Sequence, residues 1–160
     1  MTLRAADPGD LRPMLDVIRA PGAARWWGEY EGQADDDELL AGWVIEIDGG
    51  VAGWLGFTEE AERKYPSVGL DIMLAPELHG NGYGPEALRL AIDHFIAKGH
   101  HRFTIDPAAA NAKAIHAYEA VGFKVIGVTR KSELGIDGRW HDGLMMDLLA
   151  EEIAESADRA

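Results

Sequence analysis

The stretch HGNGYGPEALRLAI, residues 79–92, decides the fold. Three glycines at alternate positions precede a proline, which suits the first turn of a helix. Apolar residues at helical spacing follow, so the run predicts a helix over residues 84–98 that ends at Gly99. Backbone N–H groups at a helix start have no partner within the helix and lie at the positive end of its dipole. This glycine-rich entry therefore favours either a bound phosphate group or a plain irregular turn.

Two well-known phosphate motifs do not fit this stretch. Residues 82–87 formally match the glycine fingerprint of dinucleotide-binding folds, and Asp106 lies near the offset expected of a ribose-binding acid. That fingerprint follows directly on a strand, however, whereas residues 75–79 intervene here. A Walker phosphate loop needs a Gly-Lys-Ser/Thr sequence, which does not follow.

Composition limits the classes of function. The chain has 28 acidic residues against 15 Lys and Arg, a net charge of −13 that repels nucleic acid and anionic lipid and attracts cations. With no cysteine, a disulfide, a thiolate metal site and a cysteine nucleophile are excluded, and no metal site is predicted. We expect one domain over residues 1–150, an acidic tail over 151–160, a monomer or homodimer, and no membrane association. The N-terminus lacks the apolar core of a signal peptide, which indicates a cytoplasmic protein.

Strands and helices alternate along the chain, which predicts an α/β domain with a mixed sheet. A tight hairpin is expected at residues 48–50, and the acidic residues 33–38 are read as a solvated loop. The predicted strands cover residues 2–5, 43–48, 51–57, 68–74, 101–106, 123–130 and 140–149. The predicted helices begin at Asp7-Pro8, lie around residues 25–27, and cover residues 84–98 and about 111–121.

A second motif lies downstream, in DPAAANAKAIHAYEAVGF, residues 106–123. Together with HGNGYG and the helix after it, this stretch resembles the acetyl-CoA core of the GNAT superfamily of N-acetyltransferases. The resemblance covers residues 68–123. It implies a single domain with a mixed, mostly antiparallel sheet flanked by helices, and acetyl-CoA as the acetyl donor.

The resemblance also implies which residues hold acetyl-CoA. His79 occupies a position where the family usually has Arg or Gln, and because histidine changes charge near neutral pH, it makes cofactor binding pH-sensitive. Asn111 is either a helix N-cap or a cofactor contact. Met73 and Leu74 are expected to offer backbone groups to the pantetheine arm and the acetyl oxygen. The full predicted set is Met73, Leu74, His79, Gly80, Asn81, Gly82, Tyr83, Gly84, Asn111, Ala114 and Tyr118.

Two residues are candidates for the chemistry. Tyr118 shares a helix face with Ala114, and we expect it to protonate the leaving thiolate; the alternative is an ordinary core aromatic. Asp71 interrupts the apolar and small residues of a predicted strand, where a carboxylate needs a reason. It is the candidate general base, or an electrostatic anchor for the amine, or a strand-end carboxylate that only binds backbone.

A narrower resemblance concerns the acceptor. ARWWGEY, residues 24–30, and the Asp of GLDIML are similar to aminoglycoside 6′-N-acetyltransferases, whereas GRWHDGLMMDLL, residues 138–149, is closer to general small-amine and ribosomal-protein enzymes. The predicted acceptor is the 6′-amine of an aminoglycoside, with a role in antibiotic resistance. The alternatives are a polyamine, another amino sugar, a protein N-terminus, or a non-catalytic CoA-binding module. The predicted acceptor residues are Trp26, Trp27, Glu29, Tyr30, Asp71, Asp106 and Asp142.

Overall fold

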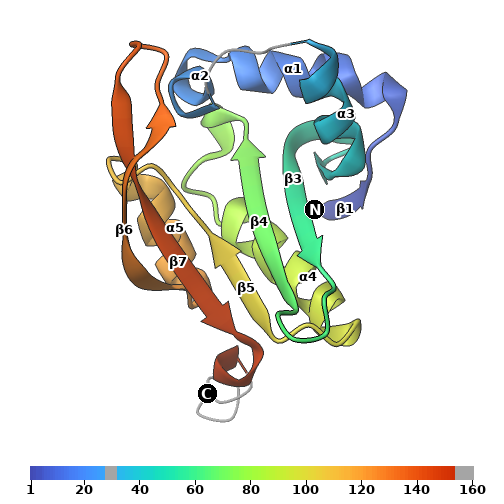
Figure 1. Ribbon diagram of the computed structural model, residues 1–160. Helices are drawn as coiled ribbons and strands as arrows, with labels where there is room; N and C mark the ends of the chain where they lie inside the picture. Colours follow the sequence, from blue (N-terminus) through green and yellow to red (C-terminus); the bar gives the residue numbers. More distant parts are fainter. Residues whose placement is uncertain (28–31, 154–160) are drawn as a thin grey trace.

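The computed structural model describes residues 1–27 and 32–153. Seven strands in this part of the chain form one sheet in the order β1-β2-β3-β4-β5-β7-β6 (Figure 1). Neighbouring strands are antiparallel except β4 and β5, which are parallel. The predicted mixed, mostly antiparallel sheet is thus confirmed. Its strands are β1 (Thr2–Ala5), β2 (Trp43–Ile47), β3 (Gly50–Glu60), β4 (Ser67–Leu74), β5 (Arg102–Ile105), β6 (Lys124–Leu134) and β7 (Trp140–Leu149).

Helices flank the sheet in two groups. In Figure 1, α4 and α5 lie behind the sheet, while α1, α2 and α3 lie across its upper end. None of the described helices is long and apolar enough to span a membrane. The α-helices are α1 (Leu11–Arg19), α2 (Pro21–Trp27), α3 (Gln33–Ala41), α4 (Tyr83–Ala97) and α5 (Ala112–Val121), with short 3-10 helices η1 (Pro8–Asp10) and η2 (Pro76–Leu78).

The core consists of two clusters on opposite faces of the sheet. Successive side chains of a strand point to opposite faces. Val68 and Leu70 of β4 accordingly pack in the larger cluster with the buried face of α4, including Phe95. Met73 of the same strand packs in the other cluster, with Met14 of α1. Both clusters therefore meet at β4, the strand that carries Asp71.

Short sequence signals correctly predict the turn between β2 and β3 and both ends of α5. The hairpin between β2 and β3 turns at Asp48 and Gly49, whose φ angles are 53° and 80°, as a two-residue turn of this kind requires. Asn111 caps α5 by accepting a hydrogen bond from Ala114 N–H at 3.2 Å. Gly122, in the left-handed region, ends that helix.

The predicted loop over residues 33–38 is wrong, because these residues belong to α3. The apolar end of the helix is anchored in the core. Leu39 is buried in the second cluster, and its carbonyl oxygen accepts a 2.9 Å hydrogen bond from the Trp54 indole.

After the last strand, residues 150–153 continue from β7 as a helical turn. The boundaries of the domain and of the acidic tail remain predictions.

Candidate active site

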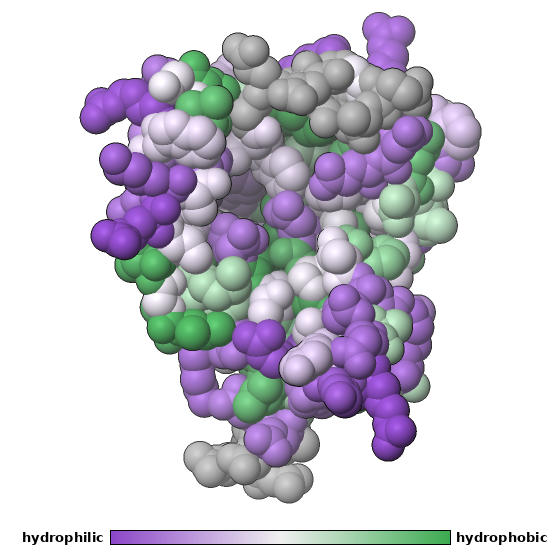
Figure 2. All heavy atoms as spheres, viewed as in Figure 1, coloured by the Kyte–Doolittle hydropathy of each residue, from purple (hydrophilic) through white to green (hydrophobic). Residues whose placement is uncertain are grey.

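The sheet opens between its two parallel strands. β4 and β5 pair only at Val68 with Phe103 and at Gly69 with Thr104, and Figure 1 shows the strands diverging above this point. β4 continues to Leu74 with β3 as its partner on the other side. Its free edge, over residues 70–74, therefore borders a gap within the sheet. Figure 2 shows the surface hollowed on this face, between the upper end of β4 and the β6–β7 ribbon.

Alternation along β4 decides which backbone groups face the gap. Ala75 N–H donates to Ala52 C=O at the end of β3, and the Met73 carbonyl oxygen lies against Gly53 of β3. Backbone groups of alternate residues point to the same neighbouring strand. Ile72 and Leu74 consequently face the gap. Of the two residues predicted to offer backbone groups to the cofactor, Leu74 faces the gap, and Met73 has its carbonyl directed at β3.

Two side chains already occupy these groups. The Asp71 carboxylate accepts a hydrogen bond from Ile72 N–H at 3.1 Å. The Leu74 carbonyl oxygen lies 2.9 Å from His79 Nε2. Because a carbonyl oxygen only accepts, Nε2 of His79 carries the hydrogen. The first residue of the glycine segment thus bends back onto the free edge of β4.

The glycine segment fits a phosphate group. Gly80 and Gly82 have φ angles of 82° and 85°, a conformation that other residues adopt only with strain. A Cβ atom at either glycine, or at Gly84, would meet no atom within 4 Å, so open space adjoins the backbone. No side chain among the described residues caps the N-terminus of α4, where Tyr83 begins the helix. Asn81 binds the Leu78 carbonyl at 3.2 Å and fixes the loop.

Asp71 lies among other carboxylates. Solvent reaches it from the hollow, but surrounding protein atoms exclude water from its other sides, and this desolvation is the main reason that its pKa is raised to about 7. The charges of Asp106, Glu38 and Glu133 raise it further, and only the hydrogen bond from Ile72 lowers it. Desolvation also raises the pKa of Asp106. Among the described residues, no cation pairs with Asp71 or Asp106.

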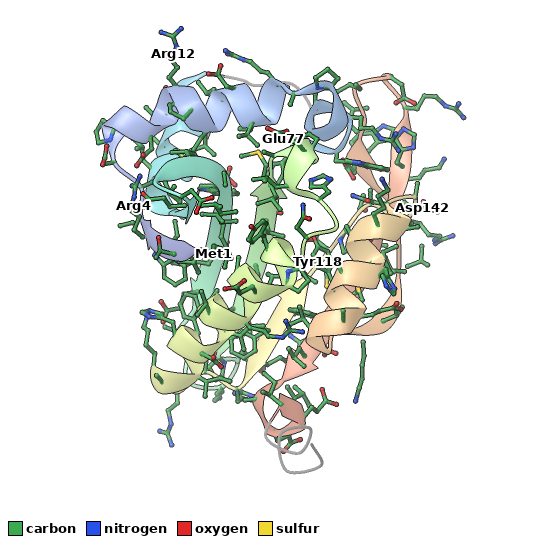
Figure 3. All side chains as sticks on the ribbon, turned by 180° about the vertical axis from the view of Figure 1, so that it is seen from behind. Met1, Arg4, Arg12, Glu77, Tyr118 and Asp142 are labelled. Atoms are coloured by element: carbon green, nitrogen blue, oxygen red, sulfur yellow. The ribbon has the colours of Figure 1, made fainter. Side chains whose placement is uncertain are left out.

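Tyr118 lies at the same place from the opposite side of the sheet. It is buried on α5, edge to face with Phe123 at 6.3 Å between ring centroids, and Figure 3 shows it between α4 and α5. A 2.7 Å hydrogen bond from Arg89 of α4 to the Ala120 carbonyl holds the two helices together. Burial raises the pKa of Tyr118, and the charges of Asp71 and Asp106 raise it further, so the hydroxyl stays protonated. The structure thus brings Asp71, Asp106 and Tyr118 into one electrostatic group.

The other predicted acceptor residues are engaged within the fold or cannot be placed. Trp27 packs edge to face on Trp54 at 5.7 Å between centroids. The Arg25 guanidinium covers the Trp26 ring at 4.1 Å. Asp142 accepts a 2.7 Å hydrogen bond from Lys131 N–H, and Figure 3 shows it further out than Tyr118. Glu29 and Tyr30 lie outside the described residues.

Sequence reasoning did not place Glu38 and Glu133 near Asp71. It also missed the two hydrogen bonds on the free edge of β4, that of Ile72 N–H to Asp71 and that of His79 to the Leu74 carbonyl. Glu38 belongs to the run read as a loop, and a helical reading that buried Leu39 could have found it. Glu133 gives no signal, because its place depends on an irregular register between β6 and β7, where Glu133 pairs with His141. The contact of His79 with Leu74 depends on the path of the glycine loop.

Comparison with known proteins now decides the family, because the acetyltransferase (GNAT) family model matches residues 10–123. The chain belongs to the GNAT family of acetyltransferases. It is similar to the spermidine N(1)-acetyltransferase of Vibrio cholerae, 29% identical over 161 residues that cover 93% of this chain and 92% of the relative. It is also similar to the streptothricin acetyltransferase of Streptomyces lavendulae, 27% identical and covering 89% of this chain and 72% of the relative.

A solved structure supports the same assignment. The crystal structure of the V. cholerae spermidine N-acetyltransferase in complex with CoA and spermine matches with a TM-score of 0.78 and 28% identity, over 94% of this chain and 95% of that one. This GNAT protein is accordingly an acetyl-CoA-dependent N-acetyltransferase. The open edge of β4 and the uncapped, glycine-lined start of α4 suit acetyl-CoA, whose arm carries amides and whose other half carries phosphates.

Proposed function

We propose that this N-acetyltransferase acetylates a primary amine of a polycationic small molecule, with a linear polyamine such as spermidine as the preferred acceptor. The observation that carries the proposal is the pair Asp71 and Asp106, which lie close enough for the charge of Asp106 to raise the pKa of Asp71 and have no cation partner among the described residues. A bound ammonium group would supply the missing positive charge. Glu38 and Glu133 extend the negative potential beyond this pair, which suits a second charge on the same molecule.

The sequence alone predicts an aminoglycoside acceptor ahead of a polyamine, and two observations support the opposite order that we propose. The flat surfaces expected to stack on a sugar are occupied, Trp26 by Arg25 and Trp27 by Trp54. The similarity to spermidine acetyltransferases extends over more than nine-tenths of this chain. With Trp26 and Trp27 engaged in these contacts, the acidic residues fit a flexible chain of ammonium groups better than a ring system that needs an aromatic surface to stack on.

A sugar-containing antibiotic is the second candidate. The similarity to streptothricin acetyltransferase favours it, since that relative's name identifies an antibiotic as its acceptor. The aminoglycoside 6′-amine belongs to the same alternative, because both acceptors are polycations that an acidic hollow attracts.

The chain's own groups supply the proton transfers of a direct attack in a ternary complex. Asp71 holds the ammonium group and accepts its proton, directly or through water; a pKa of about 7 makes the carboxylate a better base than an ordinary aspartate. The neutral amine then forms the new N–C bond as the C–S bond of the thioester breaks, and the surplus proton on the nitrogen passes through water to restore the Tyr118 hydroxyl after that residue has protonated the sulfur. Tyr118 gives its proton to the departing sulfur, and Leu74 N–H faces the side from which the acetyl oxygen can be stabilised.

The test is release of free CoA thiol from acetyl-CoA with spermidine, spermine, aminoglycosides with and without a 6′-amine, streptothricin and N-terminal peptides. We expect the highest kcat/KM with the polyamines, and a mass increase of one acetyl group on a primary amine. Turnover of 6′-amino aminoglycosides alone would replace the preferred acceptor with the second candidate. CoA binding with no thiol release for any amine would leave the non-catalytic alternative.

A further inference from the structure

The free edge of β4 is capped by the protein itself. An open strand edge pairs readily with any extended chain that carries amides. Here the Ile72 N–H is taken by the Asp71 carboxylate and the Leu74 carbonyl by His79 Nε2. Asp71 is also the proposed partner of the acceptor amine, whereas the His79 side chain contacts only the Leu74 carbonyl and lies just ahead of the glycines.

The two caps lie where the arm of acetyl-CoA has to lie. A molecule that places phosphates at the start of α4 and a thioester beside Tyr118 must pass along residues 72–74. Its amides can pair with β4 only at groups that face the gap, namely those of Ile72 and Leu74. The protein and the cofactor therefore compete for the same two backbone groups.

We propose that His79 and Asp71 release the edge of β4 when acetyl-CoA binds, and that this release frees the Asp71 carboxylate for the acceptor amine. The inference rests on the proposed role of Asp71 in holding that amine. It makes the order of binding a property of the fold, because the acceptor meets a fully available carboxylate only after the cofactor has taken Ile72 N–H. His79 is a positioning residue in this scheme, acting on Leu74 rather than on the reacting atoms.

The pKa of Asp71 is consistent with the replacement of its hydrogen bond to Ile72 N–H by one from the cofactor. The Ile72 hydrogen bond is the one contact that lowers the pKa of Asp71, so its loss leaves the carboxylate more basic. The groups that act on Asp71 from the surrounding elements, namely Asp106, Glu38 and Glu133, are all acidic and remain in place. The carboxylate therefore gains basicity at the moment when the thioester is present.

NMR tests the Asp71 half without any acceptor. The Ile72 amide and the Asp71 carboxyl carbon are followed in the free protein, with saturating CoA, and with adenosine 3′,5′-bisphosphate, which has the phosphates but lacks the arm. We expect CoA to shift the Ile72 amide and to raise the pH at which Asp71 titrates, and the bisphosphate to do neither. Identical behaviour in the free and CoA-bound protein, or equal effects of the two ligands, overturns the proposal.

His79→Ala tests the other half. If His79 competes with the arm, the variant binds CoA about three- to tenfold more tightly, the amount expected for one hydrogen bond no longer lost, and binds adenosine 3′,5′-bisphosphate as before. The matched control is His101→Ala, an exposed histidine ahead of β5, which should leave both dissociation constants unchanged. Unchanged or weaker CoA binding by His79→Ala, or an equal loss for both ligands, overturns the role of His79.

Calorimetry with spermidine separates this inference from the proposed function. Spermidine should bind more tightly to the CoA complex than to the free protein. Equal spermidine affinities with and without CoA contradict the inference while leaving spermidine as an acceptor. If no amine is acetylated, the proposed function fails, and the NMR comparison still decides whether CoA uncaps β4.

Discussion

Asp10 and Asp71 are both acids placed within the fold, and their pKa values move in opposite directions. Asp10 is buried, and Arg4 binds both of its carboxylate oxygens at 2.7 Å, which lowers its pKa. Asp71 has acids around it and no cation partner among the described residues, and its pKa is raised to about 7. The first acid is neutralised by the chain and fastens β1 to the start of α1. The second has no such partner, and we propose that it holds a cation from outside.

The largest effect should come from removing the unpaired charge. Asp71→Asn should lower kcat/KM for spermidine by about 10³-fold, within the range for loss of a general base, and change the dissociation constant of CoA little. Steady-state kinetics and calorimetry measure the two quantities. Asp10→Asn is the matched control, with kcat/KM per folded molecule unchanged. A loss of less than about tenfold in Asp71→Asn would argue against both proposed roles of this residue.

Tyr118→Phe should have the next largest effect, a decrease in kcat of about 10²-fold. The ring and its contact with Phe123 remain, so only the proton donor is lost. Chemical denaturation provides the control, because the free energy of unfolding should change by less than about 1 kcal/mol. An unchanged kcat would make Tyr118 a core aromatic and nothing more.

Asp10→Asn should change stability instead of activity. Loss of the charge-assisted pair with Arg4 should lower the free energy of unfolding at pH 7 by about 2 kcal/mol, measured with urea. Because folding lowers the pKa of Asp10, its ionised form stabilises the fold above the ordinary Asp pKa of about 4. This contribution is lost as the pH falls through the lowered value, so the wild type and the variant should converge in acid. A gap that persists in acid would point to packing instead of charge.

The pH profile should show the smallest of these effects. In the free enzyme, kcat/KM should rise with pH and level off above about 7 as Asp71 ionises. This rising part of the profile, the acidic limb, should be absent in Asp71→Asn. Asp106→Asn removes a neighbouring negative charge and should move the limb to lower pH. Glu133→Gln should move it in the same direction by less, because Glu133 contributes less than Asp106. A limb unmoved by Asp106→Asn would indicate that another group controls it.

The sequence predicts those features that local chemistry determines. The hairpin at Asp48, the cap at Asn111 and the helix after the glycines follow from turn and capping preferences of single residues, and the structure confirms them. The resemblance carried by two separated motifs identified the family and its acetyl donor before any contact was known. These signals survive folding because each depends on residues only a few positions apart.

The features of the fold and of the site that the sequence did not predict depend on packing between residues far apart in the chain. Residues 33–38 form a helix because Leu39 finds a buried site, which overrides an acidic run that is typical of a loop. The effect of Glu133 on the pKa of Asp71 needs the register of β6 against β7. The sequence could nominate Asp71 as an unusual carboxylate in a strand, but its neighbours, and hence the direction of its pKa, became known only from the fold.

The short ladder between β4 and β5 has a mechanical consequence. Among the described residues, two residue pairs supply all the backbone pairing between one part of the sheet, β1 to β4, and the other, β5 to β7. Amide exchange should therefore be faster across this seam than within either part. A ligand bound in the gap would contact both sides of it and so link the two parts of the sheet. Saturation at about 100 times its dissociation constant would raise the free energy of unfolding by about 2.7 kcal/mol, so the enzyme should be most resistant to unfolding while it holds its substrate.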